Sequence, residues 1–277
     1  MTSHFITFRQ SRIHYRVSGS GPLVTVCLHG FGEFARTFDP VAADLPGHTL
    51  VAIDLPWHGE TDWREGLLME VRALRDIIRM IPEAGAKRFG LMGYSMGGRI
   101  SLALLEAFPT DVSHLVLIAP DGLKVNPWYR FATRTWAGNR VFRRVMENPG
   151  GFLQLLKMGR RAGLVNDSIM KFVHLYVDDR AMRDKVYKVW TTMRRFSPSL
   201  PAIRQQILTR QIPVFLLFGR YDRIIQAQSG ASFVQGLEPW ARVRVLDIGH
   251  QVLHPRNIQA IEEALAFCTA RSQGGMR

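Results

Sequence analysis

Short, mostly apolar runs alternate with longer stretches of helical periodicity along most of the chain. The predicted strands span 23–28, 48–53, 89–92, 113–118, 213–218 and 242–248. The stretches with apolar residues at helical spacing span 37–45, 65–81, 99–108, 227–236 and 255–271. Runs without polar alternation are typical of strands buried on both faces, and repeated strand–helix units cross over to form a parallel sheet. The pattern therefore predicts an α/β protein with a mostly parallel, doubly wound sheet and helices on both faces.

Two parts of the chain depart from this alternation. Residues 5–9 and 12–17 alternate polar and apolar positions, and the Gln10-Ser11 link between them predicts a β-hairpin. The segment from about residue 123 has the periodicity of several helices rich in Arg and aromatic side chains. An insertion at this point would lie over the carboxyl ends of the strands, where such sheets bind ligands. The expected domains are a core of residues 1–122 and 211–277 and a helical cap, or lid, at 123–210.

Length and composition suit one large core. The chain has 277 residues, 47% of them hydrophobic, and no apolar run approaches the ~20 residues that a membrane span needs. Residues 1–12 lack the basic and then apolar pattern of a signal peptide. Cys27 falls in a predicted strand and Cys268 in a predicted helix, so we expect two buried thiols rather than a disulfide framework. These features lead us to expect a cytoplasmic protein.

The segment Gly93-Tyr94-Ser95-Met96-Gly97 lies between a predicted strand and a predicted helix. A G-x-S-x-G sequence in this context is a nucleophile elbow, in which a tight turn lifts the serine hydroxyl clear of the sheet. The following helix directs its N-terminus at the reacting carbon, where negative charge develops. The alternative is a tight packing turn between strand and helix, which also favours small residues.

An elbow serine needs a base, and the base needs a carboxylate that orients it. Asp222 follows the predicted strand that ends at Phe218, and His250 follows the one that ends at Ile248. The order Ser95, Asp222, His250 is that of hydrolases with a nucleophile elbow. Taken singly, Asp222 suits a helix cap and His250 suits a hydrogen-bonded turn. Because all three follow strands in the hydrolase order, we predict a catalytic triad.

Five segments together resemble the α/β-hydrolase fold family with an inserted helical cap, and they extend over nearly the whole chain. They are His29-Gly30-Phe31-Gly32, the loop 54–59, the elbow, the segment 218–222 and Gly249-His250. The resemblance implies a serine hydrolase that cleaves a carboxylic ester or a related acyl compound through an acyl-enzyme. It places the oxyanion hole at the backbone N–H groups of Phe31 and Met96. Gly30 and Tyr94 are the candidate substrate contacts beside them.

No cofactor is expected, and no His, Cys and carboxylate cluster has metal-ligand spacing. A serine nucleophile argues against dehalogenases and epoxide hydrolases of this fold, whose elbow carries an aspartate. Gly97-Gly98-Arg99 resembles the elbow of the menaquinone-pathway synthases, where the arginine helps to bind an anionic substrate. A salt bridge to a neighbouring residue explains Arg99 equally well. A lyase or C–C bond hydrolase acting on a carboxylate, and a small-molecule receptor, therefore stay open as alternatives.

The formal net charge of +13 is concentrated in one segment. Between Gly122 and Gln211 there are 18 Lys and Arg residues against 5 Asp and Glu, and the rest of the chain is formally neutral. A basic surface that only aids solubility accounts for this. An anionic partner is the functional alternative: a carboxylate substrate, an acidic membrane surface or, by resemblance to the biotin-pathway methyl-esterase, an acidic acyl carrier. We expect no nucleic-acid partner.

Overall fold

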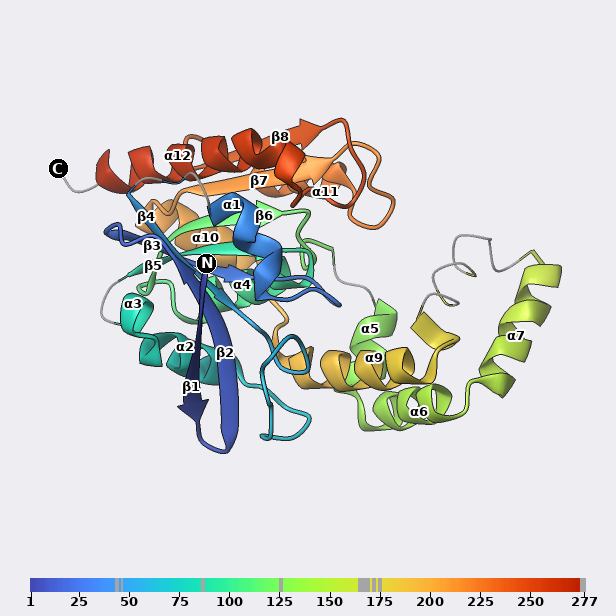
Figure 1. Ribbon diagram of the computed structural model, residues 1–277. Coiled ribbons are helices and arrows are strands. Elements are labelled where there is room, and N and C mark those ends of the chain that lie inside the picture. The colour runs from blue at the N-terminus through green and yellow to red at the C-terminus, as the bar shows by residue number, and fades with distance from the viewer. Residues whose placement is uncertain are drawn as a thin grey trace. The chain divides into compact units, whose positions relative to one another are not determined.

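The computed structural model describes residues 1–42, 45, 47–85, 88–124, 127–163, 170, 173 and 176–274. The chain forms two compact units (Figure 1). The larger unit consists of Met1–Glu65, Glu70–Lys124 and Phe196–Arg277. The smaller unit consists of Gly66–Met69 and Val125–Arg195.

The larger unit is built on an eight-stranded sheet in the order β1-β2-β4-β3-β5-β6-β7-β8. The strands are β1 Thr2–Phe8, β2 Ser11–Ser18, β3 Leu23–Leu28, β4 His48–Ile53, β5 Phe89–Tyr94, β6 Val112–Ile118, β7 Val214–Gly219 and β8 Ala241–Leu246. The hairpin β1–β2 is antiparallel and pairs antiparallel with β4, and all other pairs are parallel. The mostly parallel sheet confirms the predicted doubly wound α/β architecture.

Helices cover both faces of this sheet, which is why most residues of its central strands are apolar. The helices of the larger unit are η1 Ala35–Phe38, α1 Asp39–Ala42, α2 Val71–Met80, α3 Pro82–Gly85, α4 Met96–Ala107, α10 Leu200–Arg210, α11 Ala227–Val234, η3 Pro255–Asn257 and α12 Ile258–Gly274. Figure 1 shows α12 on one face of the sheet and α2, α3 and α4 on the other. On the α12 face, Phe215 and Leu217 share one buried cluster with Ile261 and Leu265. All six residues of β5 and of β7 are buried between these layers.

The described residues of the smaller unit form helices and connecting segments, with no strand among them. Its helices are α5 Pro127–Arg134, α6 Trp136–Glu147, α7 Gly150–Arg161, α9 Arg180–Thr192 and the short η2 Met193–Arg195. The hydroxyl of Thr135 caps α6 by accepting a hydrogen bond from the Gly138 N–H at 2.9 Å. The Phe142 and Trp190 rings stack between α6 and α9, with their centroids 5.7 Å apart. Phe142 is buried, so this ring contact contributes to the packing of α6 against α9.

The start of helix α2 and the limit of the inserted unit differ from the expected ones, because residues far apart in the sequence are in contact there. The helix expected over 65–81 begins at Val71, because the Met69 N–H donates to the Thr192 carbonyl at 3.0 Å and Gly66–Met69 belongs to the smaller unit. The last helix of the expected insertion, α10, belongs to the larger unit. Its Ile203 and Ile207 are fully buried, and the Ser199 N–H before it donates to Glu106 Oε2 at 2.8 Å.

The smaller differences lie at element ends. The hairpin turn lies at Arg9 and Gln10, one residue earlier than expected, with Arg9 at a positive φ of 55°. No helix among the described residues is both long and apolar enough to cross a membrane.

Candidate active site

Ser95 is the single residue between strand β5 and helix α4. Its backbone adopts φ 50° and ψ −114°, a combination that L-residues avoid and that surrounding contacts must maintain. The Ser95 N–H donates to the Ile118 carbonyl at 2.9 Å, and the Ser95 carbonyl accepts from the N–H groups of Gly98 and Asp121 at 2.9 Å each. Three hydrogen bonds therefore fix the sharp turn that the sequence predicts at this position.

Two glycines allow other backbone segments to approach the turn. A Cβ atom at Gly97 would lie 1.8 Å from the Leu28 carbonyl oxygen, so no larger residue fits where α4 passes the end of β3. A Cβ atom at Gly30 would lie 3.2 Å from the Ser95 Cβ and 3.4 Å from the Tyr94 ring. Gly30, which the sequence predicts as a substrate contact, thus lies directly beside Ser95.

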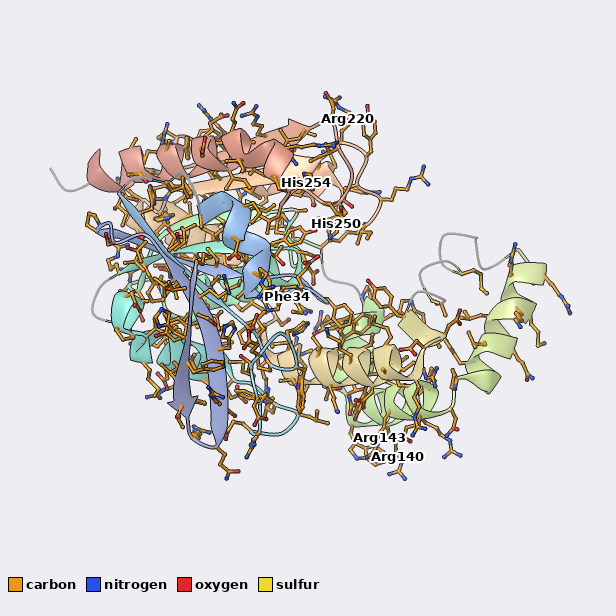
Figure 2. All side chains as sticks on the ribbon, viewed as in Figure 1. Phe34, Arg140, Arg143, Arg220, His250 and His254 are labelled. Atoms are coloured by element: carbon orange, nitrogen blue, oxygen red, sulfur yellow. The ribbon has the colours of Figure 1, made fainter. Side chains whose placement is uncertain are left out.

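Ser95, His250 and Asp222 form a continuous hydrogen-bond chain. His250 Nδ1 lies 2.7 Å from Asp222 Oδ2, and His250 Nε2 lies 3.2 Å from Ser95 Oγ. A carboxylate can only accept, so the Nδ1–H donates to Asp222 and Nε2 is left to accept from the serine hydroxyl. The Asp222 side chain is fully buried and that of His250 is 24% exposed. Figure 2 shows His250 and Phe34 at the same end of the larger unit.

The other oxygen of the Asp222 carboxylate is held by the backbone. Its Oδ1 accepts from the N–H groups of Ile224 and Ile225 at 2.8 and 2.9 Å. Burial by itself raises the pKa of this carboxyl, but the hydrogen bonds from the imidazole and from the two N–H groups outweigh burial and lower the pKa below its ordinary value. Asp222 is therefore a fixed anion beside the imidazole at neutral pH.

The two oxyanion-hole candidates lie on either side of the serine. Met96 is the first residue of α4, where backbone N–H groups have no partner within the helix. Phe31 follows Gly30 in a loop that two histidines hold in place. His29 donates from Nδ1 to the Gly30 carbonyl at 2.8 Å, and the His58 Nε2 accepts from the Gly32 N–H at 3.2 Å. The loop is thus fixed by side-chain hydrogen bonds on both sides of Phe31.

Asp54 holds the segment that follows Phe31, and it is paired with His14, which the sequence analysis did not single out. Asp54 Oδ1 accepts from the Ala35 N–H at 2.6 Å, and its Oδ2 lies 2.6 Å from Nδ1 of the buried His14. His14 comes from strand β2 of the hairpin, 40 residues earlier in the chain. His14 shares its face of β2 with Arg12 and Arg16 rather than with the apolar Ile13 and Tyr15, so the alternation of the strand gave no signal that His14 is buried.

Tyr94 contacts the imidazole that Ser95 needs. Its ring centroid lies 5.7 Å from that of His250, and its hydroxyl donates to the His250 carbonyl at 3.4 Å. Burial, followed by the negative charges of Glu33 and Asp222, raises the pKa of the Tyr94 hydroxyl well above its ordinary value. The hydroxyl therefore stays protonated and remains a donor. The sequence analysis names Tyr94 as a candidate substrate contact and does not predict its contact with His250.

Arg99 lies on α4 and is 7% exposed. Its Nε lies 3.3 Å from Asp121 Oδ2, which is the salt bridge considered as the alternative to substrate binding. A role for Arg99 in binding an anionic substrate stays a prediction.

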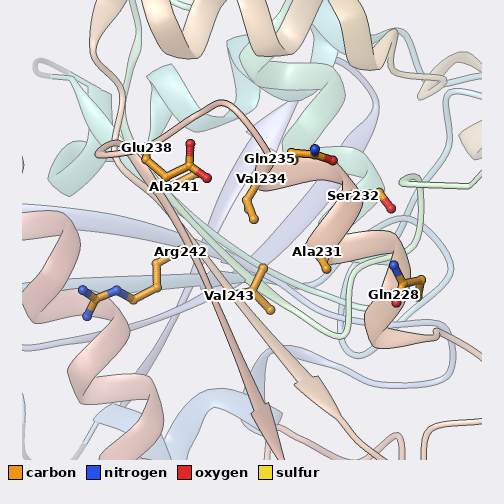
Figure 3. Close-up of a pocket in the computed structure, with 9 residues that line it drawn as sticks. All are labelled: Gln228, Ala231, Ser232, Val234, Gln235, Glu238, Ala241, Arg242 and Val243. Carbon is orange, nitrogen blue, oxygen red and sulfur yellow. The ribbon is translucent and has the colours of Figure 1, made fainter.

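The described residues include no group of three or more His, Cys, Asp or Glu side chains that could hold a metal ion. A cavity of about 500 Å³ lies at α11 and β8 (Figure 3), lined in part by Gln228, Glu238 and Arg242. None of the predicted site residues lines this cavity.

Comparison with known proteins matches residues 25–264 to the family model described as Alpha/beta hydrolase family. Over 110 residues the chain is 33% identical to a Bacillus subtilis protein provisionally assigned as a 2-succinyl-6-hydroxy-2,4-cyclohexadiene-1-carboxylate synthase, covering 38% of this chain and 40% of that protein. It is 23% identical to the human monoacylglycerol lipase ABHD6 over 83% of this chain and 70% of that protein. The matches span only 39% and 40% of the length of the first curated relatives.

Solved structures show the same fold. A thermophilic esterase from Thermogutta terrifontis superposes with a TM-score of 0.66 at 20% identity, over 96% of this chain and 98% of that chain. Likeness at this identity concerns the fold alone.

Proposed function

The chain belongs to the alpha/beta hydrolase family, and on that premise we propose that it is a serine hydrolase that cleaves a carboxylic ester or a related acyl compound. The observation that carries the proposal is the hydrogen-bond chain from Asp222 through His250 to Ser95. A nucleophile hydrogen-bonded to a base, which is hydrogen-bonded in turn to an orienting carboxylate, is the arrangement that serine-dependent acyl transfer uses. The esterase and lipase names among similar proteins support the same class of substrate.

In the first half of the reaction, Ser95 Oγ attacks the acyl carbon while His250 Nε2 takes the hydroxyl proton. The buried Asp222 carboxylate stabilises the imidazolium that forms and keeps Nε2 directed at the serine. The tetrahedral intermediate collapses when His250 returns the proton to the leaving alkoxide. An acyl group is then bonded to Ser95, and the alcohol leaves.

In the second half, His250 takes a proton from water, and the resulting hydroxide attacks the acyl-serine. The acid leaves and Ser95 Oγ recovers its proton. In both halves the Phe31 and Met96 N–H groups would donate to the oxyanion. Each such donor contributes about 3 kcal/mol of transition-state stabilisation, by analogy with side-chain donors in known hydrolases.

A series of p-nitrophenyl esters of increasing acyl length tests the proposal. We expect turnover of at least the short esters, with a loss in Ser95→Ala and in His250→Ala. His254→Ala is the matched control, because His254 is close in sequence but its Nδ1 only accepts from the Arg256 N–H at 3.2 Å. Turnover that survives Ser95→Ala would show that this site is not the one that hydrolyses the ester.

A second candidate is a lyase or C–C bond hydrolase that uses the same three residues on a carboxylate substrate. The observation in its favour is the 33% identity over 110 residues to the Bacillus subtilis synthase. The Arg99–Asp121 ion pair weighs against it, because that arginine already has an anionic partner. Labelling of Ser95 by a fluorophosphonate without turnover of any ester in the series would favour this candidate.

A further inference from the structure

Helix α7, Gly150–Arg161, contains no buried residue. Five of its twelve residues are large and apolar: Phe152, Leu153, Leu155, Leu156 and Met158. Leu155 is 65% exposed and Met158 is 64% exposed. A helix this apolar gains most of its stability in a folded protein from burying an apolar face. The exposed apolar side chains of α7 therefore indicate a contact that forms with something outside the unit.

The charge of α7 identifies the chemistry of that contact. The helix carries Lys157, Arg160 and Arg161 and no acidic residue. The smaller unit around it has 15 Lys and Arg residues against 5 Asp and Glu, a net charge of +10 out of +13 for the whole chain. A partner for α7 must therefore be anionic as well as able to accept apolar side chains.

Apolar and basic positions occupy adjoining strips of the helix. At 100° per residue, Leu155 and Met158 lie on one side, and Lys157 and Arg161 lie next to them. All four residues are exposed. The half-buried residues Phe152, Leu153 and Leu156 lie around the rest of the helix. One outward arc thus presents apolar side chains along one edge and cations along the other.

We propose that α7 docks on the surface of an anionic lipid bilayer. A bilayer offers negative head groups and an apolar boundary within about 5–10 Å of each other, which matches the two strips of α7. A nucleic acid would pair with the cations but would leave Leu155 and Met158 exposed to water. Twelve residues of helix measure about 18 Å, too short to cross the hydrocarbon core, so α7 would lie in the plane of the interface.

Helix α6 supplies further positive charge for the approach. Arg140, Arg143 and Arg144 are exposed on it, and Trp136 at its start is 78% exposed. Figure 2 shows Arg140 and Arg143 on the side of α6 turned away from α9. Exposed cations attract an anionic membrane over roughly a Debye length, and Trp is favoured at the membrane–water interface.

The test uses the full chain and vesicles of defined composition. Cys27 and Cys268 are fully buried, so a Leu155→Cys variant can be labelled there with an environment-sensitive nitrobenzoxadiazole fluorophore. We expect a blue shift and an intensity gain with vesicles of phosphatidylcholine and phosphatidylglycerol in equal amounts, and neither change with phosphatidylcholine alone. The matched label is Leu208→Cys on α10 of the larger unit, where Leu208 is 46% exposed. Its fluorescence should not change.

Cosedimentation with the same vesicles measures separately how the apolar strip and the basic strip of α7 contribute to binding. We expect Leu155→Ser with Met158→Ser, and separately Lys157→Glu with Arg161→Glu, to weaken binding about tenfold or more each. The control pair Leu208→Ser with Arg210→Glu on α10 should bind like the unchanged chain. Raising the salt from about 0.1 M to about 1 M shortens the Debye length from about 10 Å to about 3 Å and should also weaken binding.

Four results would overturn the proposal. They are no binding to anionic vesicles, binding that leaves the Leu155→Cys label in water, a label shift that depends on protein concentration without vesicles, and a label shift with polyuridylate RNA but not with vesicles. The third would assign the face to a second copy of the chain, and the fourth to a nucleic acid. None of these outcomes depends on ester hydrolysis, so the membrane proposal and the hydrolase proposal fail separately.

Discussion

Helices α4 and α7 have the same length and opposite surroundings. Each has twelve residues and a glycine pair near its start, yet ten residues of α4 are buried and none of α7 is. A Cβ atom at Gly97 of α4 would lie 1.8 Å from a backbone oxygen, whereas a Cβ atom at Gly151 of α7 would meet nothing within 4 Å. The glycines of α4 therefore serve close packing, while the structure gives no packing reason for those of α7.

The contrast between the buried α4 and the exposed α7 corresponds to the two functions that we propose for this protein, ester hydrolysis and membrane docking. Chemistry at Ser95 requires atoms held within a few tenths of an ångström, which the packed larger unit provides. Docking on a fluid surface requires exposed apolar and basic side chains, which the smaller unit provides. Substitutions at matched positions test whether the division holds.

The largest effect should come from the residue that precedes α4. We predict that Ser95→Ala or His250→Ala lowers kcat for a p-nitrophenyl ester about 10⁵-fold, and that the double variant loses little more, because the residues act as a unit. Stability should stay within about 1 kcal/mol, since neither side chain belongs to the core. Steady-state kinetics and urea unfolding measure both quantities. A double variant far worse than either single one would contradict the shared role.

Next is the close approach of α4 to β3. We predict that Gly97→Ala destabilises the protein by about 4 kcal/mol or more, because the added methyl group overlaps the Leu28 carbonyl and backbone cannot move aside cheaply. Urea unfolding followed by circular dichroism measures the loss. A loss below about 1 kcal/mol would mean that α4 is not packed as tightly as the geometry requires.

A buried histidine makes the larger unit sensitive to acid. Burial first, and then the charges of His48 and Arg88, lower the pKa of His114 from 6.5 to about 4. The imidazole of His114 binds a proton more readily in the unfolded chain than in the folded one. The free energy of unfolding is therefore unaffected by His114 above pH 6.5 and decreases as the pH falls from 6.5 towards 4. We predict a loss of about 3 kcal/mol over that range.

The control for this prediction is His114→Phe, which cannot titrate. Other groups, Asp222 among them, contribute to the acid sensitivity of both proteins, so the measured quantity is the difference between the two stability curves. The free energy of unfolding of the unchanged protein, minus that of His114→Phe, should fall by about 3 kcal/mol from pH 6.5 to pH 4. Parallel curves would show that His114 does not carry the effect.

The smallest effect should come from the glycine of α7 that matches Gly97. We predict that Gly151→Ala changes stability by less than about 1 kcal/mol, with any change favourable, because alanine is the better helix former and nothing surrounds the added methyl group. Unfolding measured as for Gly97→Ala gives the comparison directly. A large loss at Gly151 would remove the contrast between the two helices.

The parts of the fold that were predictable depend on local patterns. Five buried parallel strands follow from their apolar runs, and the turn at Ser95 follows from glycines within two residues of it. Asp222 and His250 were found because parallel strands bring their carboxyl ends to one edge of a sheet. Local sequence therefore located the three residues, although they lie far apart in the chain.

The rest depends on contacts between distant residues, which one sequence does not reveal. The contact of Tyr94 with His250 spans 156 residues, and the pairing of His14 with Asp54 spans 40. The start of α2 was misjudged for the same reason, since the helical spacing of apolar residues already begins at residue 65. Helix α10 lies within the predicted insertion but groups with the larger unit through contacts such as that of the Ser199 N–H with Glu106. The exposure of α7 could not be predicted from the sequence either, because its apolar residues are spaced as in a helix with a buried face.

Trapping of the acyl-enzyme tests the central claim most directly. The protein is mixed with a p-nitrophenyl ester, quenched with acid within the first turnover, and examined by intact mass and peptide mapping. We predict a mass increase of one acyl group, located on Ser95, in the unchanged chain and none in Ser95→Ala. An acyl group on any other residue, or ester turnover with no acylated Ser95 at any time point, would contradict the account.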